Sequence, residues 1–420
     1  MYFSVKEKLL HFIYNIGIYI VAFGLKCVAP FNHKIKLGVT GRSKTFGILK
    51  NALNKNDKTL WFHCASLGEY EQGLPVFKAL RELYKNHKFV LSFFSPSGYE
   101  IKNNKSIADV VVYLPLDTKQ NAKHFLDMVN PELTIFVKYE IWPNFLNALK
   151  KRNSRAILIS ALFKEDQAFF KFYGKSLRQA LFVFEHIFTQ NEASKKLLNS
   201  IHYSKVTVTG DTRFDRVYSQ LEQDNTVAYI EAFKQDKVCI VAGSTWPEDE
   251  VLIAEYINAH PSNDVKFIIA PHNIKSSQIE KFQQGLNVKT LLYSEIENED
   301  VSNIKVLIID SIGLLSKLYS YANIAYVGGA MGTKGMHNTL EPAVFGIPIV
   351  IGKNHAGFPE AQVMMQHKGM VSISNQQELN KALNLFIQHP TERLTSGNKN
   401  VDYIKENRGA VVQIIDFIRK

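Results

Sequence analysis

Short apolar runs rich in β-branched and aromatic residues alternate with longer amphipathic stretches over most of the chain, and this alternation is the strongest constraint on its fold. The first candidate strands are residues 59–66, 88–95, 109–116, 133–139, 155–161 and 186–190, with helical stretches such as 70–84, 120–129 and 143–151 between them. After a pause over residues 206–225, a second set follows at 238–245, 265–271, 305–310, 324–329 and 347–352. Strands joined by helices form a parallel sheet covered on both faces. The sequence therefore predicts two α/β halves of Rossmann-like type.

The N-terminal segment is apolar and is followed by a basic one. Leu9–Leu25 is about long enough to cross a hydrocarbon core, although His11 and Asn15 dilute it. The first 60 residues hold ten basic and two acidic side chains, so a net +8 of the formal +11 lies there. This local excess disfavours nucleic-acid binding and favours a membrane surface, because anionic head groups attract Lys and Arg. A signal peptide is the competing interpretation, but the segment lacks a convincing small-x-small cleavage site.

We therefore expect three segments in the 420-residue chain, which is longer than one core usually organises. Residues 1–30 form a hydrophobic membrane anchor, and whether it spans the bilayer or lies in its interface stays open. Residues 31–212 form an N-terminal Rossmann-like acceptor domain. Residues 213–420 form a C-terminal donor domain, whose last helices, within 398–420, could pack back on the first domain.

The residue types that hold metals and disulfides are sparse. Cys27, Cys64 and Cys239 stand far apart, without a CxxC pair, so a disulfide framework or structural zinc is not indicated. There is no HExxH, Walker A or convincing DxD-like motif. We expect no metal site and no cofactor.

The segment 326–352, YVGGAMGTKGMHNTLEPAVFGIPIVIG, carries the strongest candidate ligand site. A strand ends at glycines, and a glycine-rich loop leads through His337 into a helix that stops at Gly346. Such a loop lets a phosphate approach backbone N–H groups at a helix start. In the alternative interpretation Asn338 and Glu341 only cap that helix. The candidate ligand residues of this segment are Gly329, Gly335, His337, Asn338 and Glu341.

Three other strand ends of the second half carry small or polar residues. These are Ser244 and Thr245, Pro271 and His272, and the Asp310–Gly313 loop, in which Gly313 is the candidate. Each alone is typical of a cap or a turn. Because ligands of open α/β sheets bind outside the carboxyl ends of the strands, we expect these loops to converge on one crevice.

Two strand ends of the first half carry carboxylates. Ser66, Gly68 and Glu69 follow the first strand, and Ser66 and Glu69 have capping-box spacing. Alternatively, Glu69 is a general base, whose ionised form the helix dipole would favour. Lys138 and Glu140 follow another strand, with Trp142 opening the next helix either as a packing residue or as a stacking surface.

Four blocks in this order resemble the Kdo (3-deoxy-manno-octulosonic acid) transferase family of lipopolysaccharide assembly. They are SLGE (66–69), EIWPN (140–144), VTGDTRFD (208–215) and GMHNTLEPAVFGIPIVIG (335–352). The resemblance runs nearly end to end. It implies an α/β GT-B fold of two Rossmann-like domains facing across a cleft, CMP-Kdo as donor, a lipid A disaccharide precursor as acceptor, and inversion at the transferred anomeric carbon. It also implies a place at the inner (cytoplasmic) membrane surface, with both domains in the cytoplasm.

The resemblance also assigns roles to residues. Glu69 would be the general base, with Ser66, Gly68, Lys138 and Glu140 on the acceptor side. The donor pocket would consist of Ser244, Thr245, Pro271, His272, Gly313, Gly329, Gly335, His337, Asn338 and Glu341. Two departures stand out, because the family usually has Glu-Thr-Glu where this chain has Lys138-Tyr139-Glu140, and Pro-Arg-His where it has Pro271-His272-Asn273. The second removes a permanent positive charge that His272 replaces only in part, and Lys138 is a candidate for compensation.

Three other functions remain open at this point. Another GT-B transferase could use a UDP-sugar on a lipid-linked acceptor, but the pairing of S-x-G-E with HNxLEP favours Kdo transfer. A sugar-nucleotide 2-epimerase shares the double Rossmann architecture but has no use for a basic membrane anchor. In a non-catalytic lipid-binding protein Glu69 would only cap its helix, and CMP release would separate this case.

Overall fold

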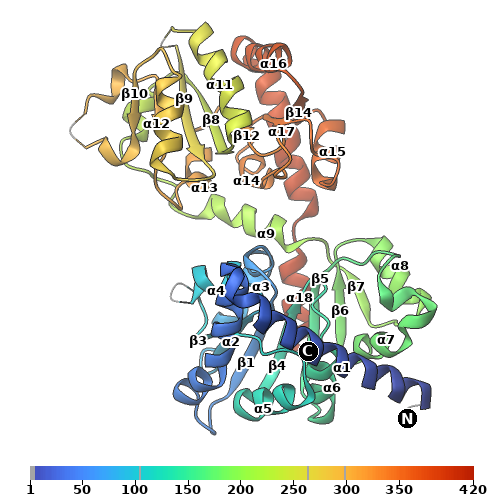
Figure 1. Ribbon diagram of the computed structural model, residues 1–420. Coiled ribbons are helices and arrows are strands. Elements are labelled where there is room, and N and C mark those ends of the chain that lie inside the picture. Colours follow the sequence, from blue (N-terminus) through green and yellow to red (C-terminus); the bar gives the residue numbers. More distant parts are fainter. Residues whose placement is uncertain (1–4, 104–105, 263, 298) are drawn as a thin grey trace. The chain divides into compact units, whose positions relative to one another are not determined.

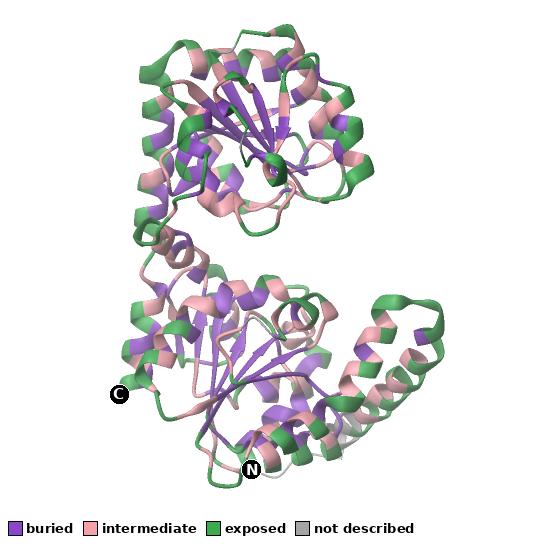
Figure 2. Cartoon of the chain, turned by 90° about the vertical axis from the view of Figure 1, so that its left-hand side faces the viewer, coloured by how far each residue is buried: buried purple, intermediate pink, exposed green. Residues whose placement is uncertain are grey.

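The computed structural model describes residues 5–103, 106–262, 264–297 and 299–420, which form two compact units (Figure 1). Unit 1 comprises Met1–Arg216 together with Arg408–Lys420, and unit 2 comprises Val217–Asn407. The C-terminal residues therefore return to the first unit. In each unit the described residues form a seven-stranded parallel sheet, and the strands are almost entirely buried (Figure 2).

The sheet of unit 1 has the order β3-β2-β1-β4-β5-β6-β7. Its strands are β1 (Thr59–Cys64), β2 (Lys88–Phe93), β3 (Val110–Tyr113), β4 (Pro131–Val137), β5 (Arg155–Ala161), β6 (His186–Thr189) and β7 (Val206–Val208). Its helices are α1 (Val5–Val28), α2 (His33–Ala52), α3 (Leu67–Leu83), α4 (Pro96–Lys102), α5 (Lys119–Val129), α6 (Pro143–Lys151), α7 (Lys175–Leu181), α8 (Glu192–Ser200), α9 (Thr212–Tyr218), which runs on into unit 2, and α18 (Ala410–Arg419).

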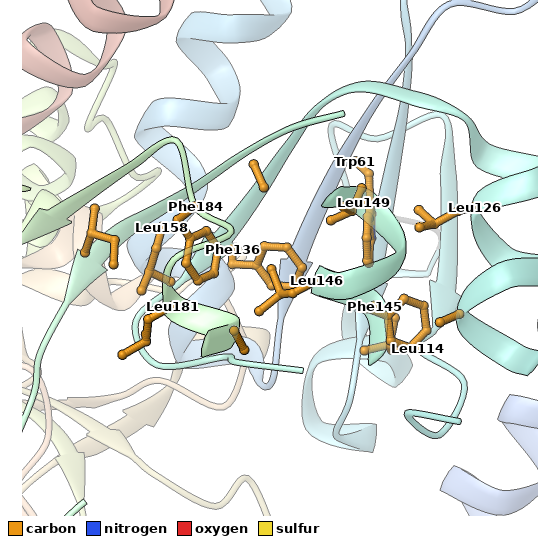
Figure 3. Close-up of a cluster of buried hydrophobic side chains, with 14 of the residues drawn as sticks. Trp61, Leu114, Leu126, Phe136, Phe145, Leu146, Leu149, Leu158, Leu181 and Phe184 are labelled. Carbon is orange, nitrogen blue, oxygen red and sulfur yellow. The ribbon is translucent and has the colours of Figure 1, made fainter. Parts of the chain in front are cut away.

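Two apolar layers hold this sheet, one on each face, because successive side chains of a strand point to opposite sides. Leu60 and Phe62 face a core that also contains side chains of α3 and α18. Trp61 faces the opposite core, where side chains of α5, α6 and α7 meet (Figure 3). The first strand is therefore apolar at nearly every position, as expected for a buried parallel strand.

The segment TGDTRFD (209–215) ties the end of the first α/β run to other parts of unit 1. Gln72 of α3 donates from Nε2 to Asp211 Oδ1 at 2.7 Å. Asp215 accepts from the backbone N–H groups of Gly409 (2.8 Å) and Ala410 (3.1 Å), at the start of α18. A carboxylate there satisfies N–H groups that have no partner within the helix. One of the four blocks that carry the family resemblance thus fixes the chain's return to unit 1.

The sheet of unit 2 has the order β10-β11-β9-β8-β12-β13-β14. Its strands are β8 (Val238–Thr245), β9 (Val265–Pro271), β10 (Thr290–Leu292), β11 (Val306–Ile308), β12 (Ile324–Val327), β13 (Ile349–Gly352) and β14 (Met370–Ile373). Its helices are α10 (Ile230–Lys234), α11 (Pro247–Ala259), α12 (Ser276–Gln284), α13 (Leu315–Leu318), α14 (Leu340–Ala343), α15 (Pro359–Gln366), α16 (Gln376–Gln388) and α17 (Pro390–Asn407).

Three strands were not predicted from the sequence: β7, β10 and β14. All three lie at an outer edge of their sheet. Their sequences, VTV, TLL and MVSI, lack the longer apolar runs that mark the other strands. The eleven longer candidates all correspond to strands.

Candidate active site

The candidate acceptor-side residues of unit 1 lie where the order of the sheet reverses. From β1 the chain continues to β2 and β3 on one side, and β4 then pairs with β1 on the other side. Glu69 follows β1, whereas Lys138 and Glu140 follow β4. Loops that leave such a switch point in opposite directions open the crevice in which α/β proteins bind ligands. The fold therefore brings together residues that are about 70 positions apart in the sequence.

Glu69 is a buried carboxyl group in the first turn of α3. Its Oε2 accepts a hydrogen bond from the backbone N–H of Ala65. The N-cap residue, Ser66, makes no side-chain capping bond. The expected capping box of Ser66 and Glu69 is therefore wrong, because Glu69 binds the amide that precedes the N-cap residue and Ser66 does not reciprocate.

The surroundings of Glu69 favour its neutral form. Burial, followed by the charge of Glu140, raises the pKa of Glu69 to about 8, while the Ala65 N–H and Lys138 act in the opposite direction. The net effect on the pKa is therefore opposite to the one expected from the helix start alone. A helix dipole contributes about 0.3–1 kcal/mol at an exposed end, and here desolvation and a like charge outweigh it. A carboxylate with a raised pKa is a stronger proton acceptor than an ordinary glutamate.

Glu140 belongs to a buried polar network that the sequence did not reveal. Its Oε2 lies 3.2 Å from His63 Nε2 and accepts from Trp142 Nε1 at 3.0 Å. On its other side, the imidazole Nδ1 lies 2.9 Å from Ser92 Oγ. Trp142 also stacks on Phe94, with ring centroids 4.8 Å apart. The only signal in the sequence was His63 itself, a polar residue within an otherwise apolar strand.

Lys138 supplies the positive charge beside these carboxyl groups. It follows the last residue of β4 with φ 68, a left-handed conformation that few residues other than glycine adopt. Its N–H donates to the Ile159 carbonyl at 2.9 Å, which holds the turn in place. Gly68 is exposed, and a Cβ there would meet Ser66 Oγ only at 3.9 Å, so there is room beside this loop.

The candidate donor residues of unit 2 also lie at a switch point, between β8 and β12. Ser244 and Thr245 end β8, Pro271 and His272 lie at the end of the neighbouring β9, and the glycine-rich loop follows β12. The His272 N–H donates to the Thr245 carbonyl at 2.9 Å, so the first two strand ends are in direct contact.

Three aromatic rings form a stack at this edge of unit 2. Trp246 and His272 are stacked with centroids 4.6 Å apart, and His272 lies 4.5 Å from His337. Trp246 Nε1 also donates to His337 Nε2 at 3.0 Å. Trp246 was not among the residues that the sequence singled out, although it directly follows Thr245 at the end of β8. His272 thus packs against a hydrogen-bonded pair of rings.

Both histidines of the stack are neutral near pH 7. Burial, followed by the proximity of His272, lowers the pKa of His337 to about 4, and burial also lowers the pKa of His272. His272 therefore supplies no positive charge at neutral pH in place of the family's arginine. A cation in this unit is Lys334, whose Nζ lies 5.8 Å from the Trp246 ring. Lys138, the residue that the sequence suggested could compensate for the missing arginine, belongs to unit 1.

The glycine-rich loop is closely packed at its start. Gly329 has φ 95, and a Cβ there would lie 2.2 Å from the Gly335 carbonyl oxygen. Asp249, a buried residue of α11, fixes the start of the loop. Its carboxylate accepts from the N–H groups of Gly329 (2.8 Å) and Trp246 (2.9 Å). The sequence did not single out Asp249 as the residue that holds the loop.

The helix after this loop is shorter than expected. The sequence predicted a helix up to Gly346, but α14 comprises only Leu340–Ala343, and turns follow it. Asn338 Oδ1 accepts from the Leu340 N–H at 3.1 Å, and its Nδ2 donates to Glu341 Oε1 at 3.1 Å. A single helical turn carries little macrodipole, so anion binding here would depend on individual N–H groups of the loop.

The remaining candidates of unit 2 differ in their surroundings. Thr245 is buried and donates from Oγ1 to Glu250 at 3.0 Å, whereas the preceding Ser244 adopts φ 54. Gly313 lies on an exposed loop after β11, with φ 97, and a Cβ there would meet nothing within 4 Å. Within the described ranges, no three His, Cys, Asp or Glu residues are grouped so that they could hold a metal ion.

Sequence comparison gives a consistent result over most of the chain. Residues 40–216 match the family described as 3-deoxy-D-manno-octulosonic-acid transferase (Kdo transferase). The 3-deoxy-D-manno-octulosonic acid transferase of Haemophilus influenzae is 27% identical over 403 residues, which cover 90% of each chain. The protein of the same name from Aquifex aeolicus is 27% identical over 336 residues, or 79% of this chain and 86% of that one. Residues 40–216 thus carry a Kdo transferase family domain, and the chain is similar to Kdo transferases over most of its length.

Solved structures of similar fold confirm the expected α/β GT-B fold class. UDP-GlcNAc 2-epimerase from Neisseria meningitidis has a TM-score of 0.61 at 16% identity, covering 86% of this chain and all of that one. MurG from Acinetobacter baumannii has a TM-score of 0.51 at 11% identity, covering 86% and 99%. At these identities the likeness concerns the fold alone. The similarity to Kdo transferases rests on the sequence relatives.

Proposed function

We propose that this protein transfers Kdo from CMP-Kdo to a lipid A disaccharide precursor in lipopolysaccharide assembly, at the cytoplasmic surface of the inner membrane. The observation that carries the proposal is Glu69, a buried carboxyl group with a raised pKa, at the switch point of a chain that resembles Kdo transferases over 90% of its length. Lys138 and Glu140 beside it belong to a motif that the sequence placed on the acceptor side.

In the proposed reaction, Glu69 Oε accepts the proton of the acceptor hydroxyl while that oxygen attacks the anomeric carbon of Kdo. The bond between this carbon and the phosphate oxygen breaks, and CMP leaves with the electron pair. Attack opposite to the leaving group inverts the configuration. The N–H groups of the glycine-rich loop and Lys334 are suited to stabilise the departing phosphate.

The direct test is incubation of the purified full chain with freshly generated CMP-Kdo and tetra-acylated lipid A precursor, followed by mass spectrometry. Each transferred Kdo adds one defined mass increment, so the same spectrum counts the sugars added. No product, from a protein that binds CMP, would reject the proposal. Product formed with a UDP-sugar in place of CMP-Kdo would favour another GT-B transferase.

The charges around Glu69 predict a distinctive pH dependence. The base must be ionised, so kcat/KM should rise with pH through about 8. Glu140→Gln removes a negative charge beside Glu69 and should move the rise in kcat/KM to lower pH. Lys138→Gln removes a positive charge and should move the rise to higher pH. Rate profiles from pH 5.5 to 9.5 measure both shifts. Shifts of the same sign in both variants would contradict the arrangement.

We expect His337→Ala and Glu341→Ala to weaken CMP binding to unit 2. If each removes one buried polar contact to the nucleotide, affinity should fall by about 1–3 kcal/mol, or roughly 5–150-fold, in calorimetric titration. His389→Ala is the matched control, because His389 is an exposed histidine of the same unit and should leave CMP affinity unchanged. Unchanged affinity in both site variants would place the nucleotide elsewhere.

A further inference from the structure

Helix α1 exposes a stripe of apolar side chains, whereas a surface helix of a soluble protein exposes polar ones. In the described part of the helix, the polar Tyr14 and Asn15 are half-buried, as are Ile18, Ala22 and Leu25 at helical spacing. The exposed stripe is apolar, and its members are Phe12, Ile13, Ile16, Tyr19, Ile20, Val21 and Phe23. Phe23 is 71% exposed, and Phe31 just beyond the helix is 90% exposed. Leaving one such side chain in water costs about 1.5–3 kcal/mol.

The polar residues of α1 are tied to unit 1. Tyr14 Oη donates to Asp117 Oδ2 at 2.7 Å, and Asn144 Nδ2 donates to Asn15 Oδ1 at 3.0 Å. Asp117 is buried and also accepts from the N–H groups of Asn144 and Phe145, both at 3.0 Å, at the start of α6. The helix also contacts α2 and α7, so that it runs alongside unit 1 (Figure 1). Asn15, which dilutes the apolar segment in the sequence, is thus one of the residues that dock the helix.

This docking decides between the two orientations that the sequence left open. Phe12–Phe31 is long and apolar enough to cross a membrane. Tyr14 lies 17 residues before Phe31, or about 25 Å along a helix at 1.5 Å per residue. A spanning helix would therefore carry Tyr14 to the far side of the hydrocarbon core, where it could not reach Asp117 of unit 1. The polar contacts and a spanning orientation exclude each other.

We propose that α1 lies flat in the membrane interface, with its Tyr14 and Asn15 edge docked on unit 1 and its apolar stripe in the lipid. The inference rests on the proposed function only in taking a membrane as the partner. It adds the orientation of α1 on that membrane. The charge pattern agrees with a bilayer surface, because Lys26, Lys34 and Lys36 are exposed at and just after the end of α1. Lysines beside a shallow apolar helix reach the anionic head groups.

The docked edge of α1 is connected to the candidate active site. Asn144 is the second residue of α6, whose N-cap residue Trp142 donates to Glu140. Asp117 and Asn144 follow the ends of β3 and β4, at the same edge of the sheet as Glu69. A membrane surface along α1 therefore lies at the edge where a lipid acceptor must present its hydroxyl.

The test measures depth along the helix. The exposed Cys27 is first replaced in Cys27→Ser, whereas Cys64 and Cys239 are buried and can stay. In this background the single substitutions Ile13→Cys, Ile20→Cys and Val28→Cys each carry a fluorophore. The labelled full chain is bound to phosphatidylethanolamine–phosphatidylglycerol vesicles. Nitroxide lipids labelled at shallow and deep acyl positions quench each site. We expect one shallow depth for all three sites and no quenching at Ile18→Cys, which faces the protein. The vesicles contain neither donor nor acceptor, so the result is independent of turnover.

A spanning helix would give a different profile, with Ile20 deepest, the two outer sites shallower, and Ile18 quenched, and this outcome would overturn the proposal. Absence of quenching at every site, with the chain in solution as a dimer, would identify a second copy as the occupant. The double variant Tyr14→Phe/Asn15→Leu provides a second measurement. It makes α1 more apolar but removes its polar contacts, so Ile18 should become quenched, whereas Tyr19→Phe on the exposed stripe should leave the profile unchanged.

Discussion

Replacing Glu69 by glutamine is expected to reduce turnover by about 10²–10⁴-fold, the usual loss when a general base is removed. Glutamine is nearly isosteric, and its side-chain oxygen can still accept the Ala65 N–H. It cannot accept the substrate proton. CMP affinity should be unchanged, because the candidate donor residues belong to unit 2. Steady-state rates and calorimetry on the same preparation separate the two effects.

The same variant should also alter stability in a pH-dependent way. The pKa of Glu69 is raised above its unfolded value, so the folded state holds a proton between about pH 4.5 and 8 that the unfolded state has released. The contribution of Glu69 to stability therefore falls as pH rises through this window. Glu69→Gln, which stays neutral, should melt at or above the wild-type temperature at pH 8.5. A stable variant with near wild-type turnover would show that Glu69 is not the base.

Truncating Ile414 should cause the largest loss of stability that a single apolar substitution in α18 can produce. This side chain is 0% exposed and lies in the core that α3 also lines, so Ile414→Ala should cost about 2–5 kcal/mol. Val412→Ala is the matched control on the same helix, because Val412 is 63% exposed and its loss should cost less than about 0.5 kcal/mol. Urea unfolding followed at tryptophans 61 and 142 of unit 1 measures both.

An equal and small effect of the two substitutions would mean that α18 does not complete the core of unit 1. Loss of the Asp215 carboxylate in Asp215→Ala offers an independent check. That variant leaves the Gly409 and Ala410 N–H groups without their acceptor and should destabilise the same unit by about 1–3 kcal/mol.

The sequence predicted the long central strands of both units because burial on both faces makes them largely apolar, as in residues 59–64. It also placed the site residues at strand ends, since that follows from topology alone. It could not predict how those ends meet. The contact of His63 with Glu140 joins residues 77 positions apart, and that of Trp246 with His337 joins residues 91 apart.

Local patterns were misleading where tertiary surroundings outweigh them. The Ser66–Glu69 spacing is typical of a capping box, and the helix start favoured an ionised carboxylate, but Glu69 turns to Ala65 and is buried. Spacing reports which groups can meet along a helix, whereas the protonation of Glu69 depends on burial and on Glu140, which comes from another strand.

The return of α18 to unit 1 has a consequence for the order in which the protein can be made. Domains generally fold as they emerge from the ribosome, with the N-terminal one first. Here unit 1 begins first but lacks Ile414, Ile415 and Ile418 until all of unit 2 has been translated. Until then its α3 face must remain uncovered. Unit 2, which is a single continuous segment, can reach its native state earlier, so the half of the enzyme that would handle the lipid is completed last.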